Sequence, residues 1–204
     1  MITTNDLLWT WDMTDMLQKD IGSRYPKLKI MKTRILKDIF LVEKDGTYKF
    51  QLDFSEQDVV IFDHIMDITE FMNLNKFNIH NQESDFSGRI VIPRIILNMK
   101  CLPPAQNEFE TQCKTASEIK SIFPQCKILF LFRYTGDYDI KMVSKTANSY
   151  DRIFIFSDEK PSEEYVYKKG ALKHSKQETL RKSYNKLVNY LCGTLKHNEF
   201  TFMS

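Results

Sequence analysis

Two apolar segments constrain the fold more than any other feature of the sequence. Residues 127 to 133 read Lys-Ile-Leu-Phe-Leu-Phe-Arg, and residues 95 to 101 read Ile-Ile-Leu-Asn-Met-Lys-Cys. The first segment is apolar at consecutive positions, as expected for a central strand that is covered on both faces. Between the two segments, residues 105 to 123 have apolar side chains at helical spacing. A strand, a helix and a second strand in this order predict a parallel crossover.

Other patterns add strands and helices on either side of this unit. Residues 28 to 54 form two strand-like runs around an Asp-Gly turn, which predicts a hairpin. Residues 152 to 157 predict a further buried strand, and helices are predicted from about residue 4 to 20 and from about 175 to 192.

The segment from Ser55 to about Asn73 fits a helix that begins with a capping box and is buried over much of its girth. Together these patterns predict an α/β fold with a mixed central β-sheet flanked by helices on both faces. We expect one domain over residues 1–204, because 42% hydrophobic and 27% charged residues are an ordinary globular balance.

The sequence shows no apolar run long enough to span a membrane and no signal-peptide pattern at its first residues. We therefore expect a cytoplasmic protein without a membrane partner. No C-x-x-C pair occurs among the cysteines, which are expected to be reduced and buried rather than zinc ligands or disulfides. These cysteines are Cys101, Cys113, Cys126 and Cys192.

Lys100 lies inside the apolar strand predicted at residues 95 to 101. Side chains of a strand alternate between its faces, so Asn98 and Lys100 share one face. An unpaired buried charge is expensive, and a lysine so placed is expected to have a partner or a task. A bent hairpin over residues 84 to 100 would bring Asp85 beside both side chains. The group would then combine a metal-binding acid, a polar ligand and a lysine at one edge of the sheet.

This arrangement resembles the motif of the PD-(D/E)XK nucleases, which include most type II restriction endonucleases. In that motif an acid on a turn is followed, after an intervening segment, by an acid, any residue and a lysine at the end of a strand. Asp85 takes the first position here, Asn98 the second and Lys100 the last.

The resemblance implies a Mg²⁺-dependent endonuclease of a restriction-modification system that hydrolyses phosphodiester bonds in double-stranded DNA. It also implies a five-stranded mixed core flanked by helices. In this interpretation Asp85 and Asn98 hold the metal ion, and Lys100 addresses the nucleophile and the scissile phosphate. A palindromic DNA site would call for a twofold homodimer.

Asn98 departs from the motif, because an amide brings no charge to the ligand shell of a hard dication. Three explanations stay open: a degenerate member of the group, another acid that substitutes, or an acid-to-amide replacement of a native aspartate. In some members a glutamate of the following helix substitutes. Glu110 and Glu118 lie ten and eighteen positions after Lys100, and Glu110 is the candidate for that role.

The region from residue 165 to 197 is basic, with eight lysines and arginines against the single acid Glu178. The run is either a solvated face or a surface for DNA phosphates. The DNA-binding candidates are Lys168, Lys169, Lys173, Lys176, Arg181 and Lys182. Two alternatives to a restriction enzyme remain: a catalytically inactive nucleic-acid-binding domain on the same fold, and a repair or transposition nuclease.

Overall fold

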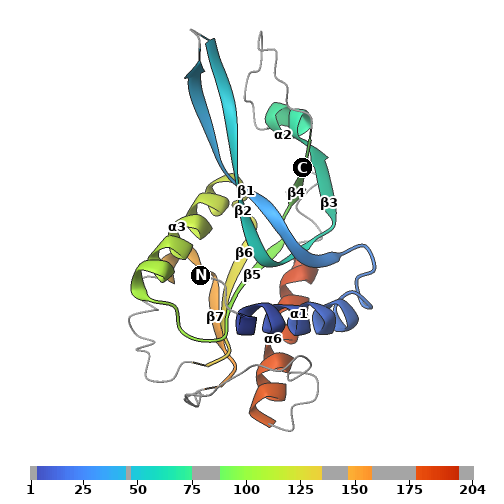
Figure 1. Ribbon diagram of the computed structural model, residues 1–204. Coiled ribbons are helices and arrows are strands. Elements are labelled where there is room, and N and C mark those ends of the chain that lie inside the picture. Colours follow the sequence, from blue (N-terminus) through green and yellow to red (C-terminus); the bar gives the residue numbers. More distant parts are fainter. Residues whose placement is uncertain (1–3, 45–46, 75–87, 135–146, 158–177, 198–204) are drawn as a thin grey trace.

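The computed structural model describes residues 4–44, 47–74, 88–134, 147–157 and 178–197. Its centre is a five-stranded sheet with the strand order β1-β2-β5-β6-β7 (Figure 1). The pairs β1–β2 and β2–β5 are antiparallel, whereas β5–β6 and β6–β7 are parallel, so the predicted mixed sheet is confirmed. Its strands are β1 (Lys29–Lys44), β2 (Thr47–Phe62), β5 (Ile95–Lys100), β6 (Lys127–Phe132) and β7 (Arg152–Ile155).

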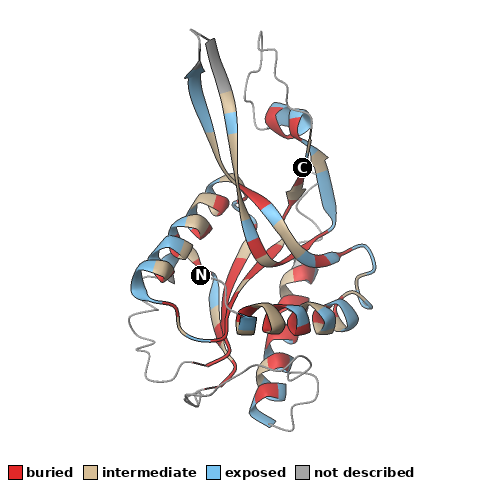
Figure 2. Cartoon of the chain, viewed as in Figure 1, coloured by how far each residue is buried: buried red, intermediate tan, exposed pale blue. Residues whose placement is uncertain are grey.

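Helices cover both faces of this sheet, as predicted. One face packs against α1 (Thr4–Asp20) and α6 (Glu178–His197). The other face packs against α3 (Gln106–Ile122), and α2 (Ile68–Leu74) adds apolar side chains to the same cluster. Buried residues therefore run along the central strands on both sides (Figure 2).

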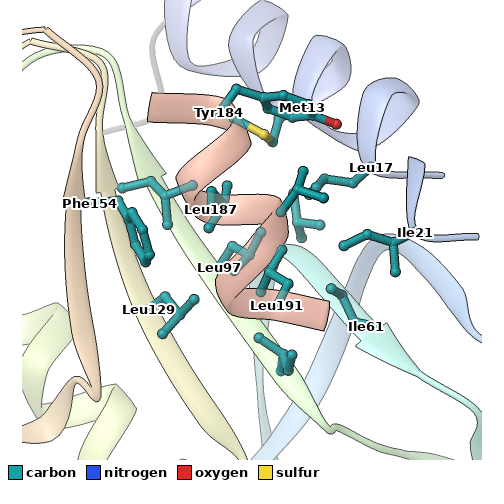
Figure 3. Packing of buried hydrophobic residues seen from close by; sticks show 14 of the residues in the cluster. Met13, Leu17, Ile21, Ile61, Leu97, Leu129, Phe154, Tyr184, Leu187 and Leu191 are labelled. Atoms are coloured by element: carbon teal, nitrogen blue, oxygen red, sulfur yellow. The ribbon is translucent and has the colours of Figure 1, made fainter. Parts of the chain in front are cut away.

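The face under α6 shows how the sequence pattern becomes a core. Figure 3 shows Leu187 and Leu191 of α6 lying against Leu97 of β5, Leu129 of β6 and Phe154 of β7. Leu187, Leu191, Leu97 and Leu129 have no exposed surface. Full burial of such a side chain stabilises a fold by about 1.5–3 kcal/mol, so this stripe fixes α6 on the sheet.

The helix predicted from Ser55 to about Asn73 is wrong over most of its length. Strand β2 continues to Phe62, β3 covers His64–Asp67, and only α2 is helical. Val60 pairs with Met31 of β1 and with Ile96 of β5, so this part of β2 is a central strand. Because both its faces are covered, its apolar run lacks the alternation of a half-buried strand, and the same residues also fit a helical period.

The predicted bent hairpin over residues 84 to 100 is also wrong. Strand β4 (Arg89–Ile92) pairs with β3 in a separate two-stranded sheet, and β5 begins only at Ile95. The break at Pro93 is confirmed, since proline cannot donate to a ladder. The backbone nitrogen of Arg94 then bonds to the carbonyl of Ile61 at 3.0 Å, which starts the pairing of β5 with β2.

Two further expectations concern the chain as a whole. All four cysteines are buried and free, as predicted. Within the ranges described, no helix is both long enough and apolar enough to span a membrane.

Candidate functional site

The carboxyl end of β5 carries the two polar side chains that the sequence singled out. Both point to the face covered by α3, as the alternation of the strand predicts. Asn98 Nδ2 donates to the hydroxyl oxygen of Tyr150 at 3.1 Å. Lys100, only 7% exposed, donates from Nζ to Glu108 Oε1 at 2.8 Å.

Asp58 of β2 is the acid that the structure places beside them. It precedes Val59, which pairs with Leu97, and therefore lies next to Asn98 on the neighbouring strand. Its Oδ2 accepts a hydrogen bond from the backbone nitrogen of Met99 at 2.8 Å. The side chain is thus held at the point where the β2–β5 ladder ends.

The pKa of Asp58 is raised above its usual 3.8, chiefly because burial disfavours the charged carboxylate. The hydrogen bond from Met99 and the positive charge of Lys100 act in the opposite direction but do not outweigh burial. The carboxylate of Asp58 therefore lacks full compensation for its charge. A cation bound beside it would favour the ionised form.

Lys100 lies between two carboxylates from different helices. Glu108 is in the first turn of α3, and Asp6 of α1 has its Oδ2 3.8 Å from Lys100 Nζ. The other oxygen of Asp6, Oδ1, accepts from the backbone nitrogen of Cys101 at 2.7 Å. Burial opposes ionisation of Glu108, yet the hydrogen bond and charge of Lys100 help to bring its pKa below the usual 4.5. Lys100 therefore ties the first turns of α1 and α3 to the end of β5.

Two further residues predicted from the sequence are Asp85 and Glu110. Asp85 lies outside the described residues. Glu110 is exposed and accepts a hydrogen bond from Gln106 Nε2 at 2.9 Å. Positions two apart on a helix face different sides, so α3 presents Glu108, and not Glu110, to Lys100.

The basic C-terminal candidates are described only in part. Lys168, Lys169, Lys173 and Lys176 lie outside the described residues. Arg181 and Lys182 are exposed in the first turns of α6, where Lys182 pairs with Glu178 at 2.7 Å.

The donor set at the end of β5 suits a hard cation with few protein ligands. Asp58 and Asn98 offer a carboxylate and an amide oxygen from adjacent strands. Magnesium in proteins usually keeps several waters and takes one or two carboxylates together with phosphate oxygens, which fits such a pair. Over the parts of the chain that are described, no group of three or more His, Cys, Asp and Glu residues is placed to hold a metal ion. A closed, all-protein metal site is therefore not what these residues form.

Asp58, Asp6 and Glu108 were missed from the sequence for different reasons. Asp58 fell in the segment interpreted as a helix, where its strand partner could not be recognised. Asp6 reaches the site from 95 positions away, and no local pattern signals such a contact. Glu108 could have been found, because it follows the lysine of the motif in the first turn of the next helix.

Neither a scan against models of protein families nor a search of the curated proteins finds a match to this chain. A search of solved structures does find matches, and one of them is a chain of a structure described as the native BbvCI A2B2 tetramer at low resolution. The TM-score is 0.53 with 10% sequence identity, and the match covers 84% of this chain and 61% of that chain. This chain therefore spans about three fifths of the length of its neighbour. BbvCI is a type II restriction enzyme, and the mixed sheet with helices on both faces is thus a restriction-endonuclease-like fold.

Proposed function

We propose that this chain is a metal-dependent nuclease that cleaves double-stranded DNA in the manner of a type II restriction enzyme. The observation that carries the proposal is the placement of Asp58 and Lys100 on adjacent strands, with Asn98 between them, in a fold shared with a restriction enzyme. Asp58 takes the role that the sequence had suggested for Asp85.

The roles of the side chains follow from their surroundings. Asp58 and Asn98 would hold a Mg²⁺ ion, which would supply Lewis-acid activation of water and would offset the charge that develops on the phosphate. Lys100 acts as a fixed cation, because Glu108 and Asp6 hold its ammonium group at the sheet edge. A positioned ammonium stabilises negative charge on a phosphate oxygen and orients the attacking water.

A cleavage assay tests the proposal. Supercoiled plasmid and long duplex DNA of varied sequence are incubated with Mg²⁺ or Mn²⁺ and with wild-type, Asp58→Asn or Asn98→Asp protein. Loss of an outer-shell partner of a metal site typically costs 10–100-fold, so we expect Asp58→Asn to lose more than about 100-fold. Asn98→Asp is expected to cut faster than wild type, because it adds a charged ligand.

Asp63→Asn is the matched control. Asp63 follows β2 at the opposite end of the pairing with β5 and forms an ion pair with Arg94. Its replacement should leave cleavage unchanged. No cleavage by Asn98→Asp on any of these DNAs would contradict the catalytic proposal.

A second candidate function is a nucleic-acid-binding domain without catalysis. It is favoured by Asn98, which supplies no charge, and by the neutralisation of Lys100 by Glu108. Calorimetry distinguishes the two candidates: binding of Mg²⁺, Mn²⁺ or Ca²⁺ in the presence of duplex DNA supports the nuclease. If no metal binds with or without DNA, the binding domain is favoured.

The proposed function also implies an oligomeric state. Cleavage of both strands at a palindromic site calls for a twofold homodimer with one active site for each strand. Sedimentation of the protein with and without duplex DNA measures this, and a protein that remains monomeric on DNA would contradict it.

A further inference from the structure

Arg133 is a buried cation with two side-chain nitrogens for which the described residues provide no hydrogen-bond acceptor. The residue is 4% exposed and directly follows β6. Its Nε and Nη1 atoms are buried and have no hydrogen-bond partner within the part of the chain that the structure describes. The guanidinium carbon lies 4.4 Å from the centre of the Tyr134 ring.

Such an arrangement is costly for the free protein. A guanidinium keeps its charge in proteins, so Arg133 cannot lower the cost by losing a proton. Stacking on a tyrosine ring compensates only part of the desolvation of a charged group. The buried nitrogens therefore lack an anionic acceptor, and phosphate and carboxylate groups are the anions whose geometry a guanidinium matches.

Arg133 lies at the same edge of the sheet as the candidate site. Its backbone nitrogen donates to the carbonyl oxygen of Lys100 at 2.9 Å, and Tyr134 makes the next such bond, to Cys101. Ligands of open α/β sheets bind at the carboxyl ends of the parallel strands, where β5 and β6 end here. The residue is thus one strand away from Lys100.

The two cations differ in how their charges are balanced. Lys100 has Glu108 and Asp6 as counterions, whereas no carboxylate in the described ranges pairs with Arg133. An anion that approaches this edge therefore gains more from Arg133 than from Lys100. This difference points to Arg133 as a binding residue that complements the catalytic group.

We propose that Arg133 binds a phosphate of the nucleic-acid backbone at the carboxyl edge of β5 and β6. The inference rests on the proposed function, because it takes duplex DNA as the source of the phosphate. Arg133 contacts a phosphate other than the one that Lys100 addresses. It contributes to affinity for any DNA sequence and does not distinguish bases.

The salt dependence of DNA binding tests this directly. The affinity for a mixed-sequence 20-base-pair duplex is measured without divalent metal over a series of salt concentrations. Each phosphate neutralised by the protein adds about 0.9 to the slope of log affinity against log salt. Arg133→Met should reduce this slope by about 0.9 and weaken binding about tenfold at low salt. Arg133→Lys keeps the charge and should keep the slope.

Arg152→Met is the matched control. Arg152 also stacks on an aromatic ring, at 5.1 Å from the centre of Phe154, but it is exposed and begins β7. Its replacement should leave the slope unchanged. The melting temperature of DNA-free Arg133→Met should equal or exceed that of wild type, because an uncompensated buried charge has been removed.

Three results would overturn the inference. The first is an unchanged salt slope for Arg133→Met. If the wild type still cleaves DNA in that case, the proposed nuclease function stands although the role of Arg133 is rejected. The second is an Arg133→Met protein that melts lower or does not fold, which would make Arg133 a structural residue. The third is a wild type that neither binds nor cleaves duplex DNA, and this result would also reject the proposed function.

Discussion

The Oδ2 atom of Asp58 accepts a hydrogen bond from the backbone nitrogen of Met99 at 2.8 Å. Val59 and Leu97 form the last backbone pair between β2 and β5, and this hydrogen bond lies just beyond that pair. A side chain therefore continues the contact between the two strands where the backbone pairing stops. The consequence is a carboxylate fixed next to Asn98 and Lys100 by the main chain rather than by a flexible surface partner.

Asp58→Asn should stabilise the metal-free protein at neutral pH. Burial raises the pKa of Asp58, so the folded state binds a proton more readily than the unfolded state, and the ionised form costs stability above the folded pKa. Asparagine can keep the bond from Met99 without the charge. We expect a higher melting temperature than wild type at pH 7 and a difference that shrinks as the pH falls toward 3.8. A lower melting temperature at pH 7 would contradict this account.

Lys100→Met should destabilise the protein and change its acid sensitivity. Removing one partner of a buried ion pair costs about 3–5 kcal/mol, and the partial exposure of Glu108 reduces the expected loss to about 2–3 kcal/mol. The pKa of Glu108 is lowered in the fold, so its contribution is present above its usual 4.5 and is lost as the pH falls through the folded pKa. Urea unfolding should show the full loss at pH 7 and a smaller loss as the pH falls below 4.5 and through the folded pKa. A loss that stays constant over this range would rule out the ion pair as its cause.

The sequence predicts the parallel half of the sheet better than the antiparallel half. The unit β5–α3–β6 was recognised because a helical period separates two apolar strands, and Pro93 marked the start of β5. Strand β2 was cut short because Val59, Val60 and Ile61 are buried from both sides. Their run fits a helix as well as a central strand, and only the pairing with β1 and β5 decides between them.

The candidate site, like the sheet, could be predicted from the sequence only in part. Asn98 and Lys100 are local to one strand, and their shared face follows from alternation. Asp58 belongs to the strand whose pattern also fits a helix, so the sequence does not show that it lies beside Asn98, and the prediction of Asp85 stays a prediction because that residue lies outside the described ranges. The contacts of Asp6 and Arg133 depend on the tertiary fold, and no spacing in the sequence encodes them.

Tyr150→Phe should lower both the stability of the fold and the rate of DNA cleavage. Its hydroxyl accepts from Asn98 Nδ2 at 3.1 Å, and its ring contacts Phe109 and Phe130. The ring contacts survive the change, so the expected loss of stability is that of one hydrogen bond, about 1 kcal/mol. Without this partner the amide of Asn98 is no longer oriented, and DNA cleavage should fall at a given Mg²⁺ concentration.

Tyr184→Phe serves as the comparison for Tyr150→Phe. Tyr184 donates to Asp20 Oδ2 at 2.7 Å on the opposite face of the sheet, away from the site. Its replacement should also lower the melting temperature but leave the Mg²⁺ dependence of cleavage as in wild type. An equal effect of both changes on cleavage would show that Tyr150 acts only through stability.

Glu108 and Glu110 allow a matched test of which acid supports the site. The two residues lie on the same helix, but only Glu108 bonds to Lys100, whereas Glu110 accepts from Gln106 at the surface. We expect Glu108→Gln to lower cleavage at least about tenfold, because Lys100 loses the carboxylate that positions it, whereas Glu110→Gln should have no effect. Cleavage is measured for each change in the wild-type and the Asn98→Asp background. If an aspartate at position 98 is the missing metal ligand, Asn98→Asp raises cleavage both in the protein that keeps Glu110 and in the Glu110→Gln protein. Should Asn98→Asp be inert while Glu110→Gln abolishes an existing activity, the acid has moved to Glu110 and the site described around Lys100 is not the catalytic one.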